Sequence, residues 1–396
     1  MSLWHAARVE SSTSAGDEEP EPNISSLLEM LGRLTDPRSP QGRRHELVFT
    51  LAGAVVAVLA GASNYRQVAS QVADLPQSLL AQLGASWNWF ARRYDWPSEP
   101  TLRRVLQSID AGQLDLLIGS WLFERARRDT EGLLVIALDG KVLRGAWTAD
   151  NGQVTLFSAM IHGVGVTVAQ IRVPDTTNEI TQVDTLLAGV PTGTPERVIV
   201  TLDAAHTQRD TAQHLRAERG FDYVMTVKGN QPTLQENVFA KCLPLLATAP
   251  GHVVEERAHG RINRWSTWTT DATGIEFPYA AQLGCIRRDV LGLDGIALSK
   301  EFALIITSSP AEHTSPADLH THVRQHWGIE NKSHYVRDTT WREDHHQAWI
   351  GNGPQTMAAL RNLASGLFRL NGLHKIKEAT EAICRDRNRA LPLLAT

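Results

Sequence analysis

The chain has 396 residues, which is enough for two or three domains and at least one large core. Its 42% hydrophobic and 21% charged residues are ordinary for a globular protein, and its net charge of −4 argues against wholesale coating of nucleic acid but leaves local basic surfaces open. The three cysteines, Cys242, Cys285 and Cys384, are too far apart for a local metal pair and too few for a disulfide scaffold. A reducing compartment fits best, so we expect a cytoplasmic location.

The first segments of the chain predict neither a secretion signal nor a membrane anchor. Residues 1–23 are polar and acidic, with no apolar signal region, and predict a disordered acidic tail. Residues 47–63, LVFTLAGAVVAVLAGAS, carry no charge but are short and rich in Ala, Gly and Val. A membrane span needs about 20 consecutive apolar residues. This segment therefore predicts a buried helix, and no membrane partner is expected.

Residues 24–128 are typical of helices throughout and predict a helical N-terminal domain. A helix near Ser98 has Pro100 in its first turn, and every third or fourth residue after it is apolar. Its expected core stripe consists of Leu102, Val105, Leu106 and Ile109.

Arginines occur in pairs along this helical region: Arg43 and Arg44, Arg92 and Arg93, Arg103 and Arg104. They form either a DNA-contacting basic face or scattered solvated charges, and charge alone leaves both readings open.

From residue 133 the pattern changes to alternating strands and helices. The run LLVIALD ends at Asp139 and predicts a strand buried on both faces. Two β-rich segments follow, then a helix after Asn178, a strand that ends at Asp203, another helix, and a strand that ends at Lys228. A helix opens at Pro232. Three strands followed by helix, strand, helix, strand and helix is the order of a ribonuclease-H-like α/β sheet.

Residues 317–346 predict a helix whose apolar stripe of Leu319, Val323 and Trp327 continues through Glu330, His334 and Arg337. Either this face carries a catalytic carboxylate, or the helix leaves the core at Glu330 and its charges are solvated. We therefore expect a catalytic domain over 129–372, with a β-rich insertion at about 245–310, and a basic helical tail over 373–396.

Acidic residues follow two of the expected strands. Asp139 and Asp203 each stand at the carboxyl end of an apolar strand, which is the edge where α/β sheets bind ligands. Glu330, on a helix packed against that sheet, would complete an acidic cluster that is costly without a cation. Oxygen ligands without cysteine favour Mg²⁺ or Mn²⁺. Two such ions would clamp the attacking and leaving oxygens of a phosphoryl displacement.

Cationic and histidine side chains near these acids in the sequence suit a phosphodiester substrate. These candidates for phosphate or DNA contact are Lys141, Arg144, Lys228, Lys332, His334 and Arg337, together with Arg43, Arg44, Arg103 and Arg104 in the helical region. A strand-end aspartate alone is more often a turn former, so the joint occurrence carries the argument.

Taken together, the motifs ALDGKVLRG, VIVTLDAAHTQ, YVMTVKGNQ, HGRI and HWGIEN resemble a DDE transposase of bacterial insertion sequences. The resemblance is to the As-one type, the H-repeat-associated branch of the IS-four-like group, and covers roughly residues 25–372. It implies a ribonuclease-H-like domain with a β insertion before the last acid. It also implies that Asp139, Asp203 and Glu330 form the metal-binding triad.

The chain departs from the wider group around its glutamate. The group's Tyr, Arg, Glu, Lys signature is Val323, His326, Glu330 and Arg337 here. This leaves open whether His326 and Arg337 contact phosphate. The branch's Leu-His-Trp is Ser333, His334 and Tyr335 in this chain, which keeps the histidine.

Two further patterns have alternative explanations. Seven histidines between 313 and 346 could suggest zinc, but none has the HExxH spacing or a cysteine partner, so solvated or phosphate-contacting histidines are favoured. Trp265, Trp268, Trp341 and Trp349 could stack on unpaired bases at a transposon end, whereas core or interface packing is the ordinary role of a tryptophan.

The sequence thus predicts a Mg²⁺-dependent transposase that cuts double-stranded DNA at the terminal inverted repeats of its element and joins the ends to target DNA. Because synapsis brings two ends together, we expect a homodimer on DNA. Two alternatives stay open: a DNA-binding relic or domesticated descendant that does not cut, and a stand-alone nuclease of the same fold.

Overall fold

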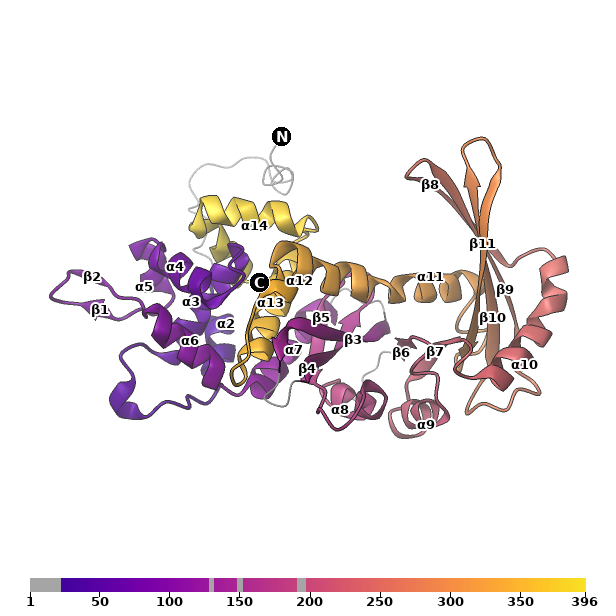
Figure 1. The fold of residues 1–396 in the computed structure, drawn as a ribbon, viewed down its shortest axis with the longest axis horizontal. Helices are drawn as coiled ribbons and strands as arrows, with labels where there is room; N and C mark the ends of the chain where they lie inside the picture. Colours follow the sequence, from indigo (N-terminus) through magenta and orange to yellow (C-terminus); the bar gives the residue numbers. More distant parts are fainter. Residues whose placement is uncertain (1–22, 128–131, 148–151, 191–196) are drawn as a thin grey trace.

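The computed structural model describes residues 23–127, 132–147, 152–190 and 197–396 (Figure 1). The acidic tail expected over 1–23 therefore lies almost wholly outside the described residues. Figure 1 shows the N-terminal helices at one end of the molecule, the sheet in the middle and the long strands of the insertion at the other end.

The N-terminal region is largely helical. Its α3 helix is buried along almost its whole length, and the stripe predicted on α6 is buried too. Among the described residues no helix is long and apolar enough to cross a membrane. The helical segments are α2 (Ser25–Gly32), η1 (Pro40–Gly42), α3 (Leu47–Leu59), α4 (Tyr65–Ala73), α5 (Gln77–Gln82), α6 (Glu99–Ser108) and α7 (Ala111–Ala126).

The expectation of helices throughout 24–128 is wrong at one place, where β1 (Trp87–Asn88) and β2 (Arg93–Tyr94) form an antiparallel hairpin. The Asn88 side-chain oxygen accepts hydrogen bonds from the backbone N–H groups of Phe90 and Ala91, both 3.0 Å long, and this closes a turn instead of a helix. Arg92 has a φ of 49°, which also belongs to a turn.

The sheet has nine strands in the order β5-β4-β3-β6-β7-β11-β10-β9-β8. β3 pairs parallel with β6, and β6 parallel with β7; the other pairings are antiparallel. The expected insertion is thus not a separate unit, because β11 pairs with β7 and extends the same sheet. The strands are β3 (Leu133–Trp147), β4 (Gln153–Ile161), β5 (Thr167–Arg172), β6 (Arg197–Leu202), β7 (Asp222–Val227), β8 (His252–Ala258), β9 (Arg261–Asp271), β10 (Gln282–Gly292) and β11 (Ala297–Thr307).

Helices cover both faces of this sheet (Figure 1). The segments between and after the strands are η3 (Glu179–Gln182), α8 (Val183–Leu187), α9 (Arg209–Gln213), the π-helical η4 (His214–Glu218), α10 (Pro232–Cys242), η5 (Leu243–Ala247), α11 (Pro316–His326), the π-helical η6 (Ile329–His334), α12 (Tyr335–Thr340), η7 (Glu343–His345), α13 (Gly353–Leu370), α14 (Ile376–Arg385), η8 (Arg387–Ala390) and α15 (Leu391–Leu394).

The two faces of β3 pack against different helices because successive side chains alternate. Val135 belongs to a small cluster with Leu319 of α11, and Ala137 packs with Ile329 of η6. Leu134, Ile136 and Leu138 join the main core instead. Residue 139 therefore points to the face that carries α11 and η6.

One main core runs from the N-terminal helices through the sheet to the C-terminal helices. α13 packs against α3, α6 and α7, and α7 packs against β5. The close approach of α7 to β5 requires glycine at 119, since a Cβ there would lie 2.2 Å from the carbonyl oxygen of Val168. The helical and sheet regions are thus held together by shared apolar packing.

Candidate active site

Asp139 and Asp203 occupy matching positions on neighbouring parallel strands. The last register pair between β3 and β6 joins Ala137 to Thr201, and each aspartate lies two residues beyond it on the same face. β3 does not end at Asp139 as expected but continues to Trp147 through its pairing with β4. What ends there is the pairing with β6, so the aspartates stand at the edge of the parallel part of the sheet.

Glu330 lies in an irregular helical segment and lines the same cavity as the two aspartates. The single helix expected over 317–346 is broken into α11, η6 and α12, and Glu330 lies in the π-helical turn η6. A π-turn shifts the side-chain period, so the predicted stripe is interrupted. Leu319 is fully buried, whereas Trp327 is 60% exposed. Ile329 packs on Ala137 and Met160 and holds the turn against β3.

All three predicted acids line one cavity of about 790 Å³. The cavity lies between the ends of β3, β6 and β7, the insertion strands β9 to β11, and the α11–η6 segment. Its cationic lining consists of Lys228, Arg288 and Arg324, and its aromatic lining of Trp265, Phe302 and Trp327. Carboxylates therefore meet cations and flat apolar side chains in a space that is open to solvent.

The acids repel one another across this cavity. Burial, together with the negative charges of Asp203, Glu179 and Glu330, raises the pKa of the Asp139 carboxyl to about 7. The backbone N–H groups of Ala205 and His206 donate to Asp203, at 3.0 and 3.3 Å. A cluster of repelling carboxylates is the oxygen-only donor set that suits Mg²⁺ or Mn²⁺.

The carboxylates of this cavity suit a metal ion in the kind of donor atom that they offer. Throughout the described ranges, no three His, Cys, Asp or Glu side chains stand close enough together to hold a metal ion. The carboxylates share the cavity walls without forming a closed coordination cluster.

The buried His334 and the half-buried His326 lie beside the acidic site. His334 Nδ1 lies 3.4 Å from Oδ2 of Asp139, and burial lowers the pKa of His334 to about 3. His326 Nδ1 lies 3.0 Å from the hydroxyl of Thr201, and burial lowers the pKa of His326 to about 4 although the nearby Asp203 charge opposes this. Both rings are therefore neutral at pH 7, and His334 supports Asp139 more directly than it could reach a phosphate in the cavity.

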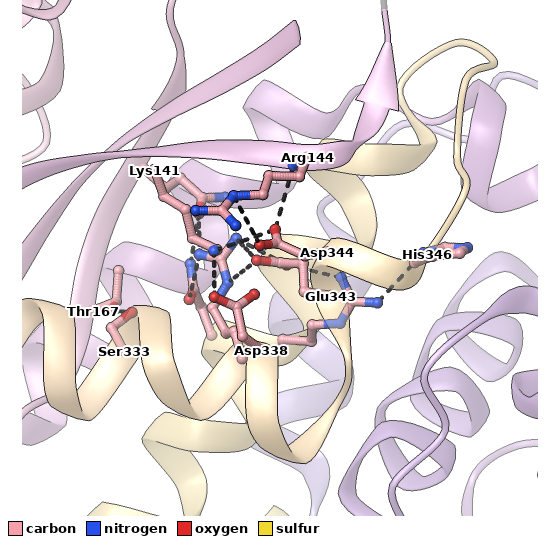
Figure 2. Close-up of polar contacts among 12 residues, drawn as sticks. Lys141, Arg144, Thr167, Ser333, Asp338, Glu343, Asp344 and His346 are labelled. Atoms are coloured by element: carbon pink, nitrogen blue, oxygen red, sulfur yellow. Dashed lines mark hydrogen bonds and ion pairs between the residues drawn. The ribbon is translucent and has the colours of Figure 1, made fainter.

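Two of the predicted phosphate contacts lie beside the acidic site but are directed at other carboxylates. Figure 2 shows Lys141 and Arg144 on β3 facing Asp338 and Asp344. Lys141 is buried, and its Nζ lies 2.7 Å from Asp338 and 3.5 Å from Asp344. The Arg144 side chain is 80% exposed and 3.6 Å from Asp344. Arg144 is thus accessible to DNA, whereas Lys141 anchors the helical segment to the strand.

Arg337, a candidate for phosphate contact, lies inside the protein and binds other side chains. It is 1% exposed and donates to both carboxylate oxygens of Glu343, at 2.8 and 2.9 Å. Arg361 donates to Glu343 as well, at 2.8 Å, and Arg337 also donates to Gln170 and Asn362. Although burial opposes ionisation, the two guanidinium groups hold the pKa of Glu343 at about 2. Arg337 therefore stabilises the fold from within the core.

The remaining predicted contacts are at the surface but not all at one site. Lys228 is exposed in the cavity, whereas Lys332 donates to the carbonyl of Gly163 and lines a separate cavity on the other side of α11. The N-terminal arginines are exposed and each has a local partner: Arg43 pairs with Asp36, Arg44 with Asp95, Arg103 with Glu99, and Arg104 donates to the carbonyl of Pro100.

The tryptophans considered as base-stacking candidates divide into buried and accessible ones. Trp268 and Trp341 are buried, and Trp341 donates to the carbonyl of Val58. Trp265 lines the acidic cavity, with the Arg324 guanidinium 3.9 Å from its ring centre. Trp349 is 62% exposed and donates to the carbonyl of Gly145.

Sequence reasoning missed a further carboxylate beside Asp139. A Cβ at Gly140 would lie 1.8 Å from Oε1 of Glu179, so this carboxylate occupies the space that a side chain at 140 would need. Oε2 of Glu179 lies 3.8 Å from Nε2 of the buried His206, whose ring stacks on Phe157. The glycine directly after Asp139 was the signal that could have revealed this close approach.

Comparison with known proteins identifies the family of this chain. The "Transposase DDE domain" model matches residues 130–367, and the "DDE_Tnp_1-associated" model matches residues 28–122. The chain is 25% identical over 394 residues to the "H repeat-associated putative transposase YhhI" of Escherichia coli K12, covering 94% of this chain and 98% of that protein. It is 29% identical over 264 residues to the "Uncharacterized protein in dhlA 3'region" of Xanthobacter autotrophicus, covering 66% and 84% of the two chains.

Among solved structures, the piggyBac transposase in a synaptic complex with hairpin DNA is similar with a TM-score of 0.38 and 11% identity, over 93% of this chain and 79% of that chain. That similarity is too low to carry an argument. The family model, in contrast, spans more than half of the chain and includes Asp139, Asp203 and Glu330. On this ground, the chain belongs to the DDE transposases, in the H-repeat-associated branch.

Proposed function

We propose that this chain cuts DNA at the ends of its element and joins the freed ends to target DNA, in a reaction that depends on divalent metal. The observation that carries the proposal is the convergence of Asp139, Asp203 and Glu330 on one cavity from two neighbouring strands and a packed helical turn. The strand order β5-β4-β3-β6-β7, with parallel pairing at β3, β6 and β7, supports a ribonuclease-H-like catalytic core.

The three carboxylates would hold Mg²⁺ or Mn²⁺, two ions in the active complex, and the DDE transposase domain family generally uses such ions. Bound there, the metal supplies activation of water or of a 3′-hydroxyl for in-line attack on phosphorus. Burial and the repulsion among the carboxylates together raise the pKa of Asp139 to about 7. A bound cation would relieve that repulsion.

The other residues of the cavity would position DNA around this acidic centre. Lys228, Arg288 and Arg324 lie where phosphates flanking the cut can be neutralised. Trp265 offers a ring in the same cavity on which an unpaired base can stack. The neutral His334 lies 3.4 Å from Asp139, outside the cavity lining, and would restrain the orientation of that carboxylate.

The test is cleavage of DNA that carries the terminal inverted repeats, with Mg²⁺ or Mn²⁺ and purified protein. Alanine at Asp139, Asp203 or Glu330 should abolish strand cleavage while binding to the ends persists. Glu312→Ala, an exposed carboxylate outside the cavity, is the matched control and should cleave normally. Near-normal cleavage by any of the three alanine variants would falsify the site assignment.

The same assay separates the alternatives. Binding by the wild-type protein without nicks in either metal favours a relic that occupies the ends. Cleavage without joining to a target favours a stand-alone nuclease. Synapsis of two ends by a homodimer is part of our proposal and predicts two protomers in the complex that joins DNA, which light scattering of that complex measures.

A further inference from the structure

The β1–β2 hairpin carries two large aromatic side chains that the molecule leaves uncovered. Trp89 is 83% exposed and Phe90 is fully exposed at 102%, both in the turn between the strands. Figure 1 shows this hairpin projecting from the N-terminal helices at the end of the molecule opposite the insertion strands. Exposed apolar side chains that lie next to one another often mark a binding surface.

Contacts between its two strands and with neighbouring residues hold the hairpin in place, so the fold itself exposes the two aromatic side chains. Trp87 packs edge-on against Tyr94 across the strands, with ring centres 5.0 Å apart. The Gln77 side chain accepts from the backbone N–H of Tyr94 and donates to its carbonyl. Asn88 closes the turn with its side-chain oxygen and donates to Asp95 at 2.7 Å. These contacts fix the turn that carries Trp89 and Phe90 at the surface.

The base of the hairpin is electropositive. A hollow of about 340 Å³ there is lined by Arg38, Arg44 and Arg93, with Asp95 as its carboxylate. The side chains of Arg44 and Arg93 are 73% and 52% exposed. Arg93 is three positions after Phe90 in the chain, so their Cα atoms are at most about 11 Å apart. Phosphates follow one another every ~3.4 Å along the axis of each DNA strand, so the arginines and the tip can engage the same few nucleotides.

We propose that this hairpin binds DNA, with Trp89 and Phe90 wedged against a base step and Arg44 and Arg93 on the neighbouring phosphates. Aromatic rings stack on bases irrespective of sequence, and apolar wedges inserted at base steps unstack them and bend the duplex. The arginines favour this partner over a second copy of the chain, whose hairpin would bring the same positive charges face to face. The inference rests on the proposed function, since the hairpin would be a second DNA-binding site of the transposase, at the end of the molecule away from the insertion.

The experiment uses the full-length protein and a terminal-repeat duplex that carries a fluorescent purine analogue, with binding read by anisotropy and unstacking by analogue emission. The double variant Trp89→Ala/Phe90→Ala should bind roughly 5- to 150-fold more weakly, the range expected for loss of one stacked base, and should lose the emission change. The slope of log affinity against log salt should stay as in the wild type, because no charge is removed. Arg44→Gln and Arg93→Gln should each reduce that slope by about one.

Phe239→Ala is the matched control, an aromatic that is 42% exposed on α10 near the insertion strands, and it should bind as the wild type does. Thermal unfolding checks that the double variant keeps its fold. Phe90→Glu, a single change at a fully exposed position, provides a second test with the same expected loss of binding and emission change.

Three results would overturn the inference. The first is unchanged binding and emission in the double variant. The second is an emission change that survives in Phe90→Glu. The third is a wild-type dimer that the double variant converts to monomer with DNA affinity per protomer unchanged, which would assign the hairpin to a second copy. Failure of the proposed function shows differently, as absence of cleavage by the wild-type protein, whereas failure of this inference leaves cleavage intact.

Discussion

Glu343→Gln tests whether Arg337 belongs to the core or to a DNA site. Glu343 is shared by two buried guanidinium groups, those of Arg337 and Arg361, and all three side chains are at most 2% exposed. The glutamine variant keeps the shape of the side chain but leaves two positive charges buried without a carboxylate. Its unfolding should therefore be easier.

The expected size follows from two independent considerations. Removing one member of a buried ion pair and leaving the other uncompensated costs about 3–5 kcal/mol. The pKa of Glu343 falls from 4.5 in an unfolded chain to about 2 in the fold, because the two arginines outweigh the effect of burial. At about 1.4 kcal/mol for each pH unit between these values, that fall corresponds to about 3 kcal/mol. For 396 residues a loss of this size lowers the unfolding midpoint by roughly 4–6 °C.

The sign of the pH effect is set by a lowered pKa. The stabilisation is fully present above pH 4.5 and is lost as pH falls toward 2. Calorimetry of the wild type and Glu343→Gln between pH 7 and pH 3 should show the difference between them shrinking as the pH falls. Glu378→Gln is the control, an exposed pair with Lys375 whose loss should cost at most ~0.5 kcal/mol.

Equal unfolding midpoints for the wild type and Glu343→Gln at pH 7 would refute the reasoning. Arg337→Met gives a complementary result. It should lower stability and leave the salt dependence of DNA binding unchanged, whereas a phosphate contact at Arg337 would reduce the salt slope by about one.

Further predictions follow from burial and close packing. Burial raises the pKa of Asp115 to about 8, so the folded protein keeps a proton there that the unfolded chain releases. The free energy of unfolding should therefore fall by up to ~1.4 kcal/mol per pH unit as pH rises from about 4 to 8. Asp115→Asn should flatten this slope when unfolding is measured by calorimetry at a series of pH values. If Asp139 is catalytic as proposed, Gly140→Ala should slow DNA cleavage by on the order of 100-fold, since its Cβ would collide with Glu179 and displace the backbone of Asp139. Gly140→Ala/Glu179→Ala should recover part of the rate. Gly119→Ala should destabilise the protein by about 1–3 kcal/mol in urea unfolding, because the Cβ would meet the Val168 carbonyl; a stable variant would mean that α7 moves without cost.

Much of the fold could be predicted from local patterns. Apolar runs and alternation identified β3 to β7, and start and stop residues located α10 and α6, because these signals depend on a few neighbouring residues. The carboxyl ends of parallel strands meet at one edge of a sheet, so Asp139 and Asp203 could be expected together before any coordinates. The DGK, KGNQ and HWGIEN motifs then indicated the family that the comparisons show.

Only the tertiary structure decided what surrounds those acids. The partner of Lys141 is Asp338, which is 197 residues away, and no local pattern predicts an ion pair over that distance. The sequence pattern suggests that Arg337 is a surface cation, yet Arg337 is buried against Glu343, which also accepts a hydrogen bond from Arg361 of α13. The helix ends before Trp327, which is exposed, and a π-helical turn carries Glu330, because helix irregularities depend on what the helix packs against. Sequence thus determined which carboxylates meet, by strand order and alternation. Folding decided which cations are exposed and which are buried in ion pairs inside the protein, since burial and long-range partners exist only once the chain is packed.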